Sequence, residues 1–213
     1  LAISTGGADT FDASIVEFET VSVEAMLNAH SIAMTEITDE VISVTTDSAN
    51  AAGAGDDDIA DVNIALADAT GTADSLTVSF TNVDADNEME IGTSDFGTND
   101  IETLNLVFNQ GADIEDASDI NLVEIASTHD TLNISGDADV TVGATGTALT
   151  MDEIDASAAT GDITLNVGAT PAEITLGAGD DTVAFAGNLR TNDVVDGGEG
   201  DDTLTATGAA NTA

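Results

Sequence analysis

Cysteine, tryptophan and tyrosine are all absent from this chain of 213 residues. Without cysteine there can be no disulfide bond and no thiolate metal site, and with only two histidines a zinc site is not expected. The missing tryptophan and tyrosine remove the side chains that most often anchor interfaces. No apolar run approaches the ~20 residues of a membrane-spanning helix, so we expect no membrane insertion.

Basic residues are almost absent as well. Arg190 is the only lysine or arginine, against 42 acidic residues, and the formal net charge is −41. Such a chain cannot neutralise phosphates, which excludes nucleic acid and anionic membrane surfaces as partners. It also repels itself unless cations are present, so we expect it in high salt, bound to calcium, or both. Leucine, isoleucine, valine and phenylalanine total 51 residues, enough to predict a folded chain.

Short runs of alternating apolar residues predict an all-β fold with little helix. The alternating residues are Leu76, Val78 and Phe80; Leu104 and Leu106; Leu132 and Ile134; Val140 and Val142; Ile163, Leu165 and Val167; Ile174 and Leu176; Val183 and Phe185. The many small side chains and the short sequence segments that recur along the chain favour a solenoid with irregular coils and short loops over a sandwich. The one helical signal is weak and lies at 23–30, with Ser22 as N-cap.

We place a soft boundary near residue 50. Residues 1–50 are expected to form an N-terminal β-rich segment that continues a preceding solenoid, and residues 51–213 a calcium-binding solenoid. A single continuous domain is the alternative, because no composition shift marks the boundary sharply.

Two glycine- and aspartate-rich nonapeptides are the strongest motifs. They cover residues 176–184 and 197–205, and their aspartates Asp181 and Asp202 are 21 residues apart, about one solenoid coil. Glycine allows a tight turn with inward carbonyls, and aspartate supplies the hard oxygen that calcium prefers. The predicted site residues are Gly177, Gly179, Asp180, Asp181, Gly198, Gly200, Asp201 and Asp202, with a further copy at Gly53, Gly55 and Asp57. The alternative is an acidic hairpin turn that binds nothing.

These nonapeptides resemble the G-G-x-G-x-D-x-U-x repeat of the RTX (repeats-in-toxin) family, in which U is a large apolar residue. The residue pattern of 125–208, including Thr131–Val142, is similar to that of RTX-type bacterial surface-layer (S-layer) proteins. The resemblance implies a right-handed parallel β-solenoid that orders on calcium binding, leaves the cell by type I secretion and assembles on the cell surface. The implied partners are calcium ions, copies of the chain itself and surface polysaccharide.

Catalysis is not expected. His129, Asp130 and Ser127 are neighbours on one short segment and cannot form a triad by themselves. The motifs G-x-S-x-G and H-E-x-x-H do not occur. The sequence therefore predicts a calcium-dependent structural protein of a surface layer. A calcium-stiffened segment of an adhesin or filament, and the secretion domain of an RTX hydrolase or toxin, are the alternatives.

Overall fold

The structure is a computed structural model of the whole chain. It describes residues 2–3, 10–14, 21–26, 30–37, 41–46, 57–66, 72–82, 89–98, 101–110, 119–122, 130–143, 149–168, 173–185, 189 and 191–206. The surroundings of side chains are described for 72–81, 101–110, 130–143, 149–168, 173–185, 189 and 191–206.

The described residues form two nine-stranded sheets. Sheet A contains β1 (Ala2–Ile3), β3 (Val21–Met26), β5 (Val41–Thr46), β7 (Ser75–Asn82), β9 (Thr103–Gln110), β11 (Thr131–Gly136), β13 (Glu153–Ala159), β15 (Glu173–Thr175) and β17 (Val194–Asp196). Sheet B contains β2 (Thr10–Ser14), β4 (His30–Ile37), β6 (Asp57–Leu66), β8 (Met89–Thr98), β10 (Asp119–Leu122), β12 (Asp139–Val142), β14 (Ile163–Val167), β16 (Thr182–Phe185) and β18 (Thr203–Ala206).

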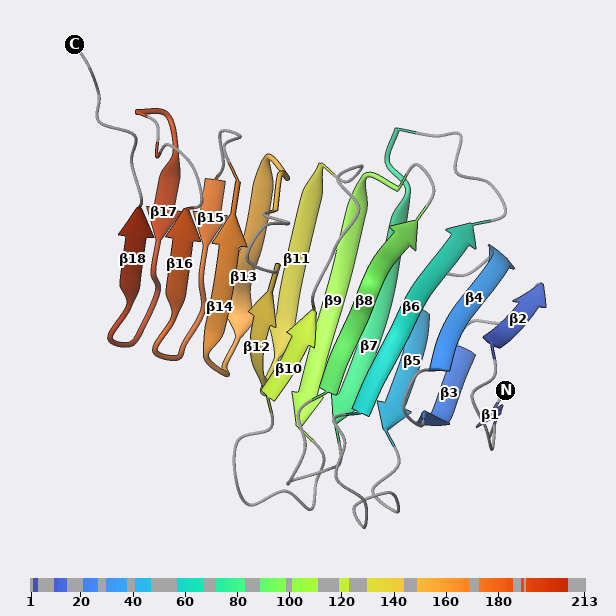
Figure 1. The fold of residues 1–213 in the computed structure, drawn as a ribbon. Helices are drawn as coiled ribbons and strands as arrows, with labels where there is room; N and C mark the ends of the chain where they lie inside the picture. The colour runs from blue at the N-terminus through green and yellow to red at the C-terminus, as the bar shows by residue number, and fades with distance from the viewer. Residues whose placement is uncertain are drawn as a thin grey trace.

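Successive strands alternate between the two sheets, as Figure 1 shows. Each strand pairs in parallel with the strand two places along the chain, for example β7 with β9 and β14 with β16. The all-β prediction is therefore confirmed for the described residues. The predicted helix at 23–30 is wrong, because β3 covers Val21–Met26 and β4 begins at His30. Pairing with neighbouring strands outweighs the weak helix propensity of this segment.

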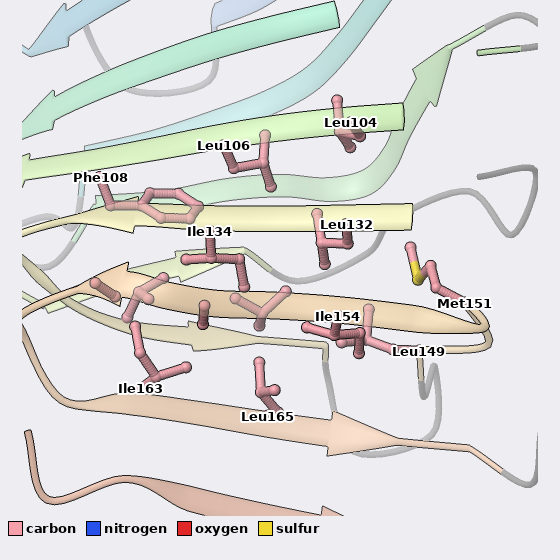
Figure 2. Close-up of a cluster of buried hydrophobic side chains, with 14 of the residues drawn as sticks. Leu104, Leu106, Phe108, Leu132, Ile134, Leu149, Met151, Ile154, Ile163 and Leu165 are labelled. Carbon is pink, nitrogen blue, oxygen red and sulfur yellow. The ribbon is translucent and has the colours of Figure 1, made fainter. Parts of the chain in front are cut away.

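The core lies between the two sheets and is made of aliphatic columns. Leu76, Leu104, Leu132 and Ile154 are in register on successive strands of sheet A, and all four are buried. Sheet B faces them with Val142, Leu165 and Val183. Figure 2 shows Leu132 and Ile154 of sheet A and Leu165 of sheet B within this buried cluster. Alternate burial along β9 and β14 confirms the period-two pattern of the sequence in these strands. Leu204 continues the sheet B column but is 50% exposed.

Phenylalanine fills the other end of the sheet A columns. Phe80 and Phe108 are stacked, with ring centroids 5.8 Å apart and an angle of 14° between the planes. Gly136 is next in register after Phe108. It has φ +117°, and a Cβ on it would lie 1.7 Å from the carbonyl oxygen of Phe108. Only glycine fits there, so the aromatic column ends at β11.

Strand pairing crosses residue 50. Strands β4 and β5 pair with β6 and β7, respectively, which lie on the other side of that position. Among the described residues there is no helix long and apolar enough to cross a membrane.

Candidate metal site

The two C-terminal nonapeptides form stacked turns between the sheets. One turn joins β15 to β16 and the other joins β17 to β18, and Thr182 pairs with Thr203 directly after them. The backbone N–H of Glu199 donates to Gly177 O at 2.9 Å, and the N–H of Gly179 donates to Glu199 O at 3.1 Å. The structure thus brings the two predicted loops together, with Asp181 and Asp202 at equivalent positions.

Glycine is required in these turns for two reasons: the backbone has positive φ angles, and the backbones of neighbouring turns lie very close together. Gly179, Gly198 and Gly200 have φ of +149°, +84° and +128°, which side chains rarely adopt. A Cβ on Gly200 would lie 1.9 Å from Gly179 O, and a Cβ on Gly198 would lie 2.1 Å from Gly177 O. The missing side chains therefore let each turn lie directly on the carbonyl groups of the turn before it.

Asp181 has the most unusual environment in this region. It is the only polar or charged residue in the buried set of the described side chains, with 1% of its surface exposed. Its Oδ1 accepts the backbone N–H of Ile163 at 2.7 Å. Its Oδ2 is buried and has no hydrogen-bond partner. A carboxylate oxygen in that position is costly unless a cation or proton compensates it.

The electrostatics agree with the geometry. Burial is the main cause that raises the pKa of Asp181, and the negative charges of Asp202 and Asp162 raise it further. The N–H groups of Ile163 and Gly177 act in the opposite direction without cancelling these effects. Asp202 accepts the N–H of Asp181 through Oδ1 at 3.1 Å, and it is exposed. In the metal-free form the Asp181 carboxyl group thus lies in a buried position that disfavours its negative charge.

Two further turns belong to the same stack, and the sequence analysis missed them. By register, Asp139 and Asp162 occupy the positions of Asp180 and Asp201 in earlier turns. In each of the first three turns the aspartate Oδ1 accepts the backbone N–H of the aspartate in the next turn. Asp139 accepts from Asp162 at 2.7 Å, Asp162 from Asp180 at 2.8 Å, and Asp180 from Asp201 at 2.9 Å. The recurring Gly-Asp dipeptide at 161–162, 179–180 and 200–201 was the available signal.

This aspartate ladder gives Asp180 a role that the motif alone did not suggest. Its carboxylate holds the next turn in place through the N–H of Asp201. The ladder also places a row of negative charges along one edge of the molecule, at the start of the sheet B strands. Neighbouring strands are about 4.8 Å apart, so these carboxylates repel one another where they are exposed.

The donor set suits a hard cation such as calcium. Calcium takes roughly 6–8 oxygen ligands at about 2.3–2.6 Å, and stacked turns offer main-chain carbonyls together with the carboxylates of Asp181 and Asp202. In the part of the chain that the structure describes, no three His, Cys, Asp or Glu side chains gather at one point. Most ligands would therefore have to be carbonyl oxygens, which this glycine-rich backbone exposes.

Of the third predicted copy of the motif, the structure describes Asp57 alone. Gly53 and Gly55 lie outside the described residues, and so does His129. Asp57 is the first residue of β6 and pairs with Met89 of β8. Comparisons with protein-family models, with curated proteins and with solved structures each found no match to this chain.

Proposed function

We propose that the chain is a calcium-dependent structural protein of a bacterial cell surface, built as a right-handed RTX-type β-solenoid. In this proposal calcium binds between the turns 177–181 and 198–202. Asp181 and Asp202 supply carboxylate oxygens, and the glycine-rich backbone supplies carbonyls. Calcium would complete the stacked turns, and the ordered coils would then assemble into a surface layer after type I secretion.

One observation carries this proposal: the buried, unpartnered Oδ2 of Asp181 in a turn that stacks on an equivalent turn. An ordinary acidic turn would leave its carboxylate in water. Here burial of the charge costs free energy that a bound divalent cation can compensate. The net charge of −41 adds a second reason for cation-linked order, because self-repulsion opposes both folding and assembly.

The surface-layer role is favoured by what the chain can contact. Its acidity removes nucleic acid and anionic lipid as partners, and the regular parallel sheets offer extended faces to copies of itself. The sequence contains neither of the catalytic motifs G-x-S-x-G and H-E-x-x-H. A non-enzymatic scaffold is therefore the function most consistent with the site and the composition.

Calorimetry on the Asp181→Ala, Asp202→Ala double variant tests the metal site. We expect it to bind at least one calcium ion fewer than the wild type and to be less ordered in calcium. The matched control is Asp130→Ala, Asp152→Ala, which removes the same charge from exposed turns at the other edge of the sheets. Equal calcium stoichiometry in all three proteins would show that the motif turns bind no ion.

Ion identity separates a metal site from general charge screening. In concentrated sodium chloride the repulsion is already screened, and screening does not depend on which cation is present. Calcium added under these conditions should still increase the β-sheet content. Magnesium should increase it less, because magnesium prefers a tighter octahedral ligand shell. Two-dimensional protein arrays in electron micrographs would support the surface-layer role, whereas end-to-end fibres would indicate an adhesin or filament segment.

A further inference from the structure

The outer face of strands β7, β9 and β11 carries no charge. Its outward residues alternate with the buried core positions and are all uncharged: Ser75, Thr77, Ser79, Thr81, Thr103, Asn105, Val107, Asn109, Thr131, Asn133 and Ser135. We call this set the neutral face. The chain as a whole has 42 acidic residues among 213, so about two acidic residues would be expected among eleven random positions.

Charge returns on the next strands of the same sheet. Glu153 and Asp155 of β13, Glu173 of β15 and Asp196 of β17 lie beside inward-facing core residues and point away from the core. Glu153 is directly in register with Thr131 of the neutral face. At the two ends of these strands the acidic residues lie in turns: Asp74, Glu102 and Asp130 come before the strands, and Asp137 follows β11 and accepts the N–H of Gln110 at 2.8 Å. The absence of charge is thus a property of a defined patch of sheet A.

Hydrogen bonds between strands order the neutral face. The Asn133 amide donates to Asn105 Oδ1 at 2.7 Å. The Asn105 amide is 3.3 Å from Ser75 Oγ and 3.4 Å from Thr77 Oγ1 on the preceding strand. Asn109 donates to Ser79 Oγ at 3.2 Å. These contacts fix the side chains before any partner arrives, which lowers the entropy cost of binding.

We propose that the neutral face is the contact through which a second copy of this chain docks. The inference rests on the proposed self-assembly and names the surface that performs it. Two copies of a chain with net charge −41 repel each other wherever acidic faces meet, and like charges across an interface cost several kcal/mol. A cationic partner would instead prefer the acidic strands. Within the described part of sheet A, the neutral face is where this repulsion is smallest.

The chemistry of the face also fits a copy of itself. Serine and threonine hydroxyls both donate and accept, so identical faces related by a two-fold axis can satisfy each other. Strands β7, β9 and β11 have eight, eight and six residues and cover ~350 Å² per copy, or ~700 Å² in total, which is below the ~1,000 Å² of a stable specific interface. A contact of this size suits a lattice with many weak contacts.

Substitutions at Val107 test the contact. Val107 points outward, is half-buried, and pairs with Ser79 and Ser135 on its two neighbours. In calcium, Val107→Asp should weaken association of the full chain at least about tenfold by sedimentation, whereas Val107→Thr keeps the face neutral and should associate like the wild type. The matched control Thr175→Asp adds the same charge to the same sheet, on β15 beside Glu173, and should leave association unchanged.

The absence of cysteine allows a second measurement that does not depend on the effect of an added charge. With a short bis-maleimide linker, Val107→Cys should cross-link into dimers in calcium, and Thr175→Cys should not. Three results would each overturn the inference. The first is a wild type that assembles while Val107→Cys does not cross-link, the second is unchanged association of Val107→Asp, and the third is a wild type that stays monomeric in calcium. Loss of calcium binding in calorimetry would instead overturn the proposed metal site, so the two failures are distinguishable.

Discussion

The substitution Asp181→Asn separates the two effects of one carboxylate. In the metal-free protein the buried Oδ2 has no partner and faces the negative charges of Asp202 and Asp162. Asparagine keeps the shape and can still accept the N–H of Ile163 at the position of Oδ1. It removes the charge, and with it the ligand that calcium would need. The same change should therefore have opposite effects with and without calcium.

The magnitudes follow from burial. An unsatisfied buried polar group costs about 1–3 kcal/mol, and more when it is charged. Asparagine leaves the buried position without a partner but removes its charge, so without calcium Asp181→Asn should stabilise the protein by about 1–2 kcal/mol. In calcium at a hundredfold excess over the dissociation constant, a bound ion contributes roughly 2.7 kcal/mol that the variant loses. For a chain of this size each kcal/mol shifts the melting temperature by roughly 2–4 °C. The intrinsic gain offsets part of the lost binding energy, so the net loss in calcium is about 1–2 kcal/mol; we expect a rise of a few degrees in chelator and a fall of a few degrees in calcium.

Thermal unfolding followed by circular dichroism measures both shifts in the same buffer. Asp152→Asn is the matched control, because Asp152 is exposed and lies in a turn at the other edge of the sheets. It removes the same charge and should change the melting temperature equally in calcium and in chelator. If Asp181→Asn also shifts both melting temperatures in the same direction, then Asp181 is not a calcium ligand.

Three further predictions concern the turn and the core. Burial raises the pKa of Asp181, so the folded form keeps its proton above about pH 4, where the unfolded chain loses it, up to the raised pKa. The metal-free protein should therefore lose stability as the pH rises through this range, and Asp181→Asn should lose less in chemical denaturation. Gly200→Ala should destabilise the last turn by about 2 kcal/mol or more, because Gly200 has φ +128° and a Cβ on it would lie 1.9 Å from Gly179 O. A thermal stability equal to that of the exposed control Thr205→Ala would contradict this. Phe108→Ala should cost about 3–5 kcal/mol by removing a buried ring stacked on Phe80, and a loss below 1 kcal/mol would show that the column repacks.

The sequence was sufficient to predict the strand pattern of the C-terminal half. Alternating pairs such as Leu104 and Leu106 identify a strand and its buried face, because side chains on a strand alternate between faces. The sequence did not predict strands β3 and β4 over part of 23–30. Local propensity there is nearly balanced, and pairing with other strands decides between helix and strand.

The candidate site divides in the same way. The nonapeptides alone predicted which turns stack and which aspartates, Asp181 and Asp202, lie at equivalent positions, because motif spacing matches the strand repeat. Only the tertiary structure revealed that Asp181 is buried with an unpartnered oxygen while Asp202 is exposed. Burial depends on which turns lie on either side, and one nonapeptide does not contain that information.

The aspartate ladder and the neutral face also required the structure. Asp139 and Asp162 lie in turns that lack the full motif, and they are matched to Asp180 and Asp201 only by strand register. The neutral face combines residues from strands about 28 positions apart, such as Asn105 and Asn133. Composition determined that the protein is acidic, and the pairing of distant strands determined where on its surface that charge is absent.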